Sequence, residues 1–226
     1  MKIDFGSFSK QDASKYLGDK VELSLLISKK CLEEITNDFP NDSIHRIEFE
    51  ILTEGFLLFM IAARDGLLQE INKKLSSPLN ENRVNLQNAT FGNQLTSDPN
   101  PRFTQIWNLI SNCIQQPSKV IITKSPQFWE WDRTNSWLWE INALRNKIAH
   151  RSINGQQIIP GSNGLVTKLI ICELSIRPII RLNNRINTVP IPNPKLETIH
   201  EEKPKDYFEN CFKKFEKLKQ DIRNLL

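Results

Sequence analysis

Three residues with complementary chemistry stand close together in the chain, at Arg145, Asn146 and His150. The imidazole of a histidine has an ordinary pKa near ~6.5, so it can take a proton from a hydroxyl group or give one to a leaving oxygen. Arginine carries a permanent, forked positive charge that matches the oxygens of a phosphate, and an asparagine amide can orient the phosphate or the imidazole. These residue types predict proton transfer at a phosphate ester.

The residues around this motif have helical spacing between positions 137 and 151. At ~100° per residue, the apolar side chains form a stripe ~60° wide that we expect to face the core: Trp137, Ile141, Leu144 and Ile148. The opposite face carries Trp139, Asn142, Asn146 and His150, while Arg145 lies on the border between the two faces. A tryptophan facing away from the core needs a second burial partner. We therefore expect a second subunit there, and a two-fold dimer would bring two copies of His150 together.

The same residues also have an ordinary structural interpretation. Arg145 can pair with a carboxylate, Asn146 can bond to the backbone, and His150 can be a last-turn residue that the helix dipole favours. Arginine and histidine are common near helix ends, so the motif alone leaves both interpretations open.

The segment from Arg145 to His150, RNKIAH, resembles the signature of the HEPN family (higher eukaryotes and prokaryotes nucleotide-binding domain). In that family an arginine is followed by four to six residues and then a histidine, and an asparagine often comes directly after the arginine. The resemblance covers the motif, the helical layout from about residue 9 to residue 151 and the last helix of the chain. Residues 153–204 look like an elaboration.

The resemblance implies a metal-independent endoribonuclease whose active site forms at a homodimer cleft. It would cleave single-stranded RNA by attack of the 2′-hydroxyl, giving a 2′,3′-cyclic phosphate and a 5′-hydroxyl end. Arg145, Asn146 and His150 would be catalytic, and the neighbouring Lys147 and Arg151 are the candidate substrate-binding residues. A toxin or defence role is implied as well, with an antitoxin or a nucleotidyltransferase as candidate partner.

Two other functions remain open. One is a non-catalytic HEPN-like module that binds nucleotides or a protein. The other is an all-α scaffold or interaction protein, in which Arg145 pairs internally and His150 faces solvent.

Glu54, Arg64 and Asp65 are candidates for structural support of the motif. Glu54 stands in the apolar run ILTEGFLLFMIAA (residues 51–63), where a carboxylate must be paired. We expect it to pair with Arg64 or Arg145 and to fix a helix junction near the cleft. The alternative is an ordinary buried network of Glu54, Arg64 and Asp65.

Composition narrows the class of protein. The net charge of +4 is uneven, because residues 142–226 hold fifteen basic and eight acidic residues, and a basic segment attracts phosphate-bearing partners. The four cysteines and three histidines are scattered without paired-ligand spacing, so we expect reduced, mostly buried thiols, no metal site and no cofactor. No signal peptide or membrane-spanning run is evident, which predicts a cytoplasmic protein with no membrane association.

The elements that position the motif are predicted to be mainly helices. We expect one antiparallel bundle of HEPN-like layout over residues 1–152, with helices near 9–38, 44–75, 102–115 and 137–151. Residues 80–102, rich in Asn, Gly and Pro, predict a long loop, and residues 118–126 a short extended piece. Residues 153–204 should form an insert of loop and extended (β) structure with a Pro-rich linker. We expect a C-terminal helix over 205–226 that packs on the same bundle, so that the chain is a single domain overall.

Overall fold

The computed structural model describes residues 14, 16–36, 43–86, 89–115, 118–121, 129–132, 134–151, 156–161, 164–169, 179–182, 185–188 and 204–226. Side chains are described for 14, 16–36, 44–45, 47–86, 89–115, 134–146 and 204–226.

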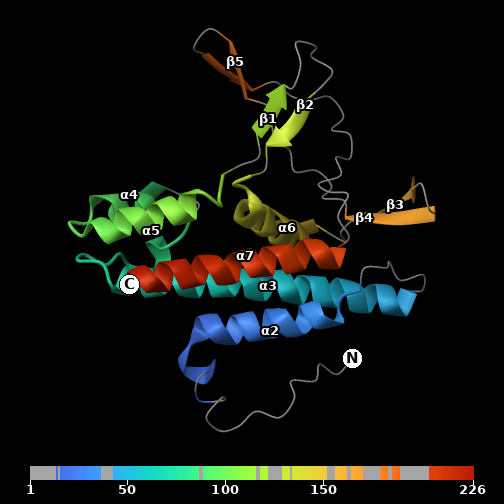
Figure 1. Cartoon of the computed structure of the whole chain (residues 1–226), viewed down its shortest axis with the longest axis horizontal. Helices are drawn as coiled ribbons and strands as arrows, with labels where there is room; N and C mark the ends of the chain where they lie inside the picture. Colours follow the sequence, from blue (N-terminus) through green and yellow to red (C-terminus); the bar gives the residue numbers. More distant parts are fainter. Residues whose placement is uncertain are drawn as a thin grey trace.

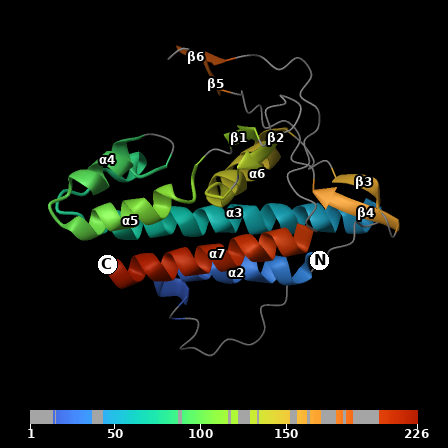
Figure 2. The same ribbon diagram turned by 45° about the horizontal axis from the view of Figure 1, so that its top comes forward.

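The chain is mainly α-helical, as predicted, and its longest helix is α3 (Ser43–Lys73). Helices α2 (Lys20–Glu34) and α7 (Pro204–Leu225) lie alongside α3, and α6 (Trp137–Arg151) lies on the side of α3 away from α2 (Figures 1 and 2). The helices α4 (Ala89–Ser97) and α5 (Pro101–Ser111) lie at the end of the structure where α7 ends. None of the helices that the structure describes is long and apolar enough to cross a membrane.

Helix α3 holds the centre of the apolar core. Phe56, Leu57, Met60 and Ala63 are each at most 1% exposed, and the ring of Phe56 lies 4.9 Å from that of Phe208 on α7. In the first half of α3, one face of the helix is exposed. Four apolar side chains there are exposed: Ile44, Ile47, Ile51 and Leu58. They fall on one face because their spacings of three, four and seven residues keep them within about 60° of one another around the helix axis.

Helix α7 completes the core with one apolar face. Its buried residues recur every three or four positions: Tyr207, Phe208, Cys211, Phe212, Phe215, Leu218 and Ile222. This spacing predicted a helix, and the observed bounds differ from the predicted ones only at the ends. The side chains of α7 belong to the same apolar cluster as those of α2, α3, α5 and α6.

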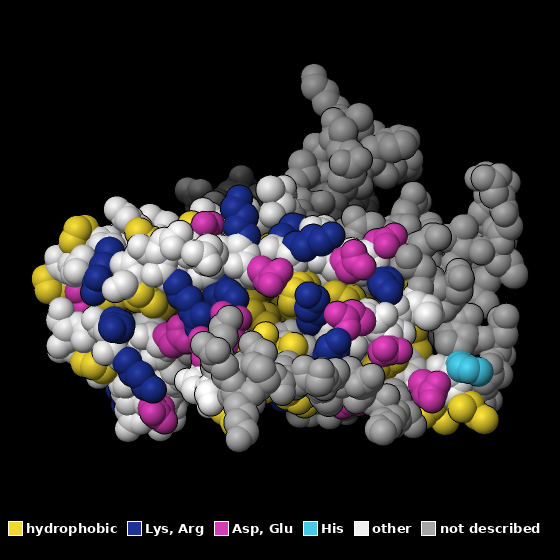
Figure 3. All heavy atoms as spheres, turned by 60° about the horizontal axis from the view of Figure 1, so that its bottom comes forward, with side chains coloured by type: hydrophobic (Ala, Val, Ile, Leu, Met, Phe, Trp, Pro, Cys, Tyr) yellow, Lys and Arg dark blue, Asp and Glu magenta, His cyan; other side chains and the backbone are white. Residues whose placement is uncertain are grey.

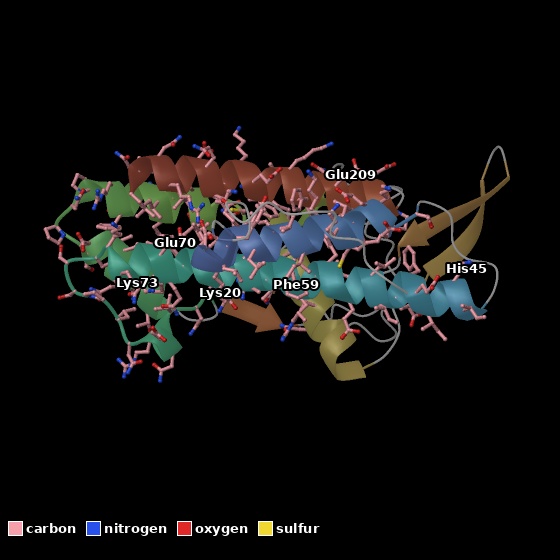
Figure 4. All side chains as sticks on the ribbon, turned by 90° about the horizontal axis from the view of Figure 1, so that it is seen from below. Lys20, His45, Phe59, Glu70, Lys73 and Glu209 are labelled. Carbon is pink, nitrogen blue, oxygen red and sulfur yellow. The ribbon has the colours of Figure 1, made fainter. Side chains whose placement is uncertain are left out.

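Charged side chains tie the last turns of α7 to α2 and α3. The Arg223 guanidinium donates to Asp19 (2.9 Å), Glu22 (2.7 Å) and Glu70 (2.6 Å), and Lys219 also bonds Glu22. The Glu70 and Asp19 carboxylates raise the pKa of Arg223. Figure 3 shows basic and acidic side chains interspersed on this face, and Figure 4 shows Glu70 on α3 near the start of α2 at Lys20.

The predicted long loop at 80–102 is wrong, because most of it is helical. It contains a short 3₁₀ turn, η1 (Glu81–Arg83), then α4 and the start of α5. Phe91 and Leu95, one turn apart, are fully buried and anchor α4 in the core. The Asn100 side chain accepts a hydrogen bond from the Arg102 amide and so caps α5, whose first residue is Pro101.

Gly92 allows the close packing of α4 on α5. A Cβ atom at this position would lie 2.4 Å from Cζ2 of Trp107. In this stretch Asn100 caps a helix, Gly92 allows close packing, and Pro101 is the first residue of a helix. A segment rich in Asn, Gly and Pro nevertheless suggests a loop when only its composition is considered.

The strands form three antiparallel ribbons among the described residues. β1 (Ser118–Ile121) pairs with β2 (Trp129–Asp132), with Lys119 opposite Trp131. β3 (Gln156–Gly161) pairs with β4 (Gly164–Leu169), and β5 (Ile179–Leu182) pairs with β6 (Arg185–Thr188). The extended piece predicted over residues 118–126 is confirmed at Ser118–Ile121, and residues 122–126 lie outside the described residues.

Three of the four cysteines are described, and all three are buried and reduced: Cys31, Cys113 and Cys211. Burial raises the pKa of the Cys113 thiol to about 12. These thiols act as small apolar core groups, as the sequence predicted.

The contact between Gly92 and Trp107 gives a first prediction. Gly92→Ala should lower the free energy of unfolding by about 1–3 kcal/mol, because the added methyl must displace the indole ring. The measurement is chemical denaturation followed by circular dichroism. Gly18→Ala is the control, since nothing lies within 4 Å of a Cβ there. Equal midpoints for the two variants would contradict the packing role of Gly92.

The Arg223 network gives a second prediction. Arg223→Gln leaves three carboxylates close together, so it should destabilise the fold by about 1–2 kcal/mol, and less at high salt because salt screens the repulsion. Lys213→Gln breaks only the exposed pair with Glu209 and should change stability by less than about 0.5 kcal/mol. Denaturation at low and high salt compares them. The network has no stabilising role if both variants match the parent.

Candidate functional site

Helix α6 is fixed at its start by the turn that follows α5. The amides of Leu138 and Trp139 donate to the carbonyl of Cys113, at 3.0 Å and 3.4 Å. These first amides of a helix have no partner within the helix, so a backbone carbonyl from a neighbouring segment satisfies them. From this start, α6 continues without a break to Arg151.

The predicted core stripe of α6 is confirmed where side chains are described. Trp137, Ile141 and Leu144 are 9%, 0% and 1% exposed, and the Trp137 ring packs edge-on against Phe215 at 6.4 Å. The side chain of Ile148 lies outside the described residues. The buried face is wider than predicted, because Leu138 and Glu140 on its two flanks are also buried.

Glu140 is a buried acidic residue whose role the sequence did not predict. Its side chain is 3% exposed, and the Tyr207 hydroxyl of α7 donates to its Oε2 at 3.1 Å. Glu140 stands in the first turn of α6, where the helix dipole favours a negative charge. An acidic residue in a first turn is so common that its position gave no signal of burial.

The second face of α6 is partly covered by α3 of the same chain. Nη1 of Arg64, on α3, donates to Oδ1 of Asn142 at 2.9 Å. Trp139, Asn142 and Asn146 are each half-buried. Arg64 of the same chain therefore covers part of the face where a second subunit is expected, and the second subunit itself stays a prediction.

Arg145 turns toward Asn146 from its position on the border of the two faces. Its Nη1 donates to Oδ1 of Asn146 at 3.1 Å. Among the described residues Arg145 has no carboxylate partner. The guanidinium is therefore held by a neutral group and keeps most of its donors and its full charge.

Arg64 and Asp65 form a close pair beside this helix. Nε and Nη2 of Arg64 donate to Oδ1 of Asp65 at 2.9 Å and 2.7 Å. The Arg64 side chain is only 14% exposed, whereas that of Asp65 is 50% exposed. Two of the three support residues predicted from sequence therefore do meet.

The expected pairing of Glu54 with an arginine is wrong for the described part of the chain. Glu54 is exposed, and Arg64 bonds Asp65 and Asn142 instead. The physical reason lies in the uncovered first half of α3. Glu54 belongs to the exposed face that also carries Ile51 and Leu58, so water solvates its carboxylate.

The other predicted site residues are placed by their backbone alone. Lys147, His150 and Arg151 belong to α6, but their side chains lie outside the described residues. His150 stands four residues after Asn146 on an unbroken helix, which places the two backbones one turn apart on the same face.

The described side chains form a site rich in hydrogen-bond donors. Arg64 and Arg145 supply two guanidinium groups, Asp65 supplies one carboxylate, and Asn142 and Asn146 supply carboxamides. Such a set is suited to an anion with several acceptor oxygens. Within the described ranges, no group of three or more His, Cys, Asp or Glu residues is placed to hold a metal ion.

Comparison with protein-family models, with curated proteins and with solved structures finds no match for the chain.

The buried pair on α6 and α7 gives a third prediction. Tyr207→Phe removes a donor from the buried Glu140 carboxylate, so it should lower the free energy of unfolding by about 1–2 kcal/mol. In the Glu140→Gln background the same change should be smaller, because a neutral amide requires less compensation. A double-mutant cycle measured by denaturation gives the coupling. Strictly additive losses would contradict a direct interaction.

Proposed function

We propose that this chain is a metal-independent endoribonuclease of HEPN type that cleaves single-stranded RNA. The observation that carries the proposal is the environment of Arg145, whose guanidinium is held by the neutral Asn146 and, among the residues that the structure describes, by no carboxylate. The charge stays available to a phosphate, and Arg145 stands five residues before His150 on the same helix.

In this mechanism His150 and its counterpart in a second subunit divide the proton transfers. One imidazole takes the proton from the 2′-hydroxyl, and the oxygen attacks the adjacent phosphorus. The other imidazole gives a proton to the departing 5′-oxygen, leaving a 2′,3′-cyclic phosphate and a 5′-hydroxyl end. Arg145 stabilises the additional negative charge on the pentacoordinate phosphate, and Asn146 holds the guanidinium in place.

The proposal places the active site at a homodimer cleft formed around the second face of α6. The half-buried Trp139 on that face supports this, since an exposed indole flank beside polar groups is typical of an interface. Lys147 and Arg151 on the same helix are the proposed substrate-binding residues. An antitoxin or nucleotidyltransferase partner and a toxin or defence role belong to the same proposal.

One observation favours the alternative of an interaction module or scaffold. The exposed face of α3 carries Ile44, Ile47, Ile51 and Leu58, which are 46–71% exposed, and His45 marks that end of the helix in Figure 4. An apolar stripe of this kind is typical of a protein-binding surface. An interaction module predicts that RNA remains intact whatever residue stands at position 150.

His150→Ala tests the catalytic role. The variant should cleave a mixed pool of single-stranded RNA at least about 100-fold more slowly, because general acid–base catalysis contributes roughly that much or more. The assay is a single-turnover time course in EDTA, which also tests independence from metal ions. His45→Ala, on α3, is the control and should cleave like the parent. A His150→Ala protein as active as the parent rejects the assignment.

A further inference from the structure

Two arginines hold two asparagines on α6 in the same manner. Arg64 donates to Oδ1 of Asn142 at 2.9 Å, and Arg145 donates to Oδ1 of Asn146 at 3.1 Å. A guanidinium group has donors and no acceptor, so the carboxamide atom that faces it must be the oxygen. Each arginine therefore fixes the orientation of its asparagine and directs the NH₂ group away from itself.

The NH₂ groups of these two asparagines are the unused half of each side chain. In the described part of the structure, Nδ2 of Asn142 and Nδ2 of Asn146 have no hydrogen-bond acceptor, and both residues are only half-buried. Asn72 on α3 is a useful contrast. It is 3% exposed and uses both ends of its amide, with Oδ1 accepting from and Nδ2 donating to the backbone of Leu79. Asn72 is structural, whereas the α6 pair offers donors outward.

The two amides stand four residues apart on α6, which places them about 6 Å from one another along the helix axis and on the same face. Together with the remaining N–H groups of Arg145, they form a row of donors along this face. A ligand that matches the row carries acceptor oxygens and negative charge at more than one point along its length. The sugar–phosphate backbone of a nucleic acid has this character.

We propose that Asn142 binds a second phosphate of the RNA, next to the phosphate held by Arg145 and Asn146. The inference rests on the proposed function for the identity of the ligand and extends it by one subsite. It makes the site selective for a strand over a mononucleotide. The Asn142 amide donates to the neighbouring phosphate and takes no part in proton transfer.

Arg64 is a positioning residue in this arrangement. All three of its nitrogens are used, Nε and Nη2 on Asp65 and Nη1 on Asn142, and its side chain is 14% exposed. Asp65 balances its charge, so Arg64 acts on the ligand through the amide that it orients.

Binding measurements on the full chain test the second subsite. His150→Ala is used as the background to prevent cleavage, and affinities for a single-stranded RNA pentamer and for a nucleoside 5′-monophosphate are measured by fluorescence anisotropy and competition. Asn142→Ala should weaken pentamer binding about tenfold, the loss of one hydrogen bond to a charged group, and should leave the mononucleotide unaffected. Asn108→Ala removes an exposed asparagine of α5 and should change neither affinity.

The outcomes separate the subsite from the nuclease activity. Equal pentamer affinities for Asn142→Ala and Asn108→Ala overturn the subsite, even if the parent protein cleaves RNA. An equal loss for pentamer and mononucleotide overturns the assignment to a second phosphate. Pentamer binding that depends on Asn142 in a parent chain that does not cleave RNA supports the subsite and refutes the nuclease. Failure to bind either ligand overturns both.

A second variant distinguishes positioning from simple fold stability. Arg64→Lys keeps the positive charge, but one ammonium group cannot reproduce the forked guanidinium, which bonds Asp65 and Asn142 at the same time. It should weaken pentamer binding about as much as Asn142→Ala and add little when the two are combined. Additive losses in the double variant would show that Arg64 acts independently of Asn142 and would overturn its positioning role.

Discussion

The burial of α3 is the constraint on which the other elements depend. Phe56, Leu57, Met60 and Ala63 are at most 1% exposed, so neighbouring helices must cover more than one side of this helix at its middle. Helix α2 packs along it, α7 reaches it through the contact of Phe208 with Phe56, and α6 lies on the side away from α2. Burial of these side chains contributes roughly 1.5–3 kcal/mol for each large one. The position of α6, and with it the candidate site, follows from this packing.

The site lies where the buried part of α3 gives way to polar contacts. Ala63 faces the core, and the next two residues, Arg64 and Asp65, form a polar pair of which Arg64 bonds Asn142 on α6. Because Arg64 is largely buried, its charge requires the Asp65 carboxylate, and its remaining donor is available for Asn142. The orientation of a polar side chain on α6 is thus fixed from α3. Arg145, in contrast, has only Asn146 as its partner in the described structure, which leaves its charge uncompensated and suited to an anion.

Sequence reasoning predicted the features that depend on periodicity. The helical bounds of α3 and α7, the core stripe at Trp137, Ile141 and Leu144, and the buried thiols follow from spacing and residue type alone. It failed where tertiary contacts decide. The Asn, Gly and Pro residues before α5 were interpreted as a loop, because the cap at Asn100 and the contact of Gly92 with Trp107 exist only in the folded chain. The apolar run around Glu54 predicts a paired carboxylate. This prediction fails because the sequence does not show that one face of α3 is exposed.

The chemistry of RNA cleavage gives the most direct test of the central claim, that α6 carries a phosphate site with a histidine as acid and base. The wild-type chain is incubated with a defined single-stranded RNA in EDTA, and mass spectrometry identifies the chemical groups at the ends of the RNA products. We expect 2′,3′-cyclic phosphate and 5′-hydroxyl ends, and no cleavage where the nucleotide 5′ of the scissile bond lacks its 2′-hydroxyl. Ends with a 3′-hydroxyl, or cleavage at the 2′-deoxy position, would contradict it.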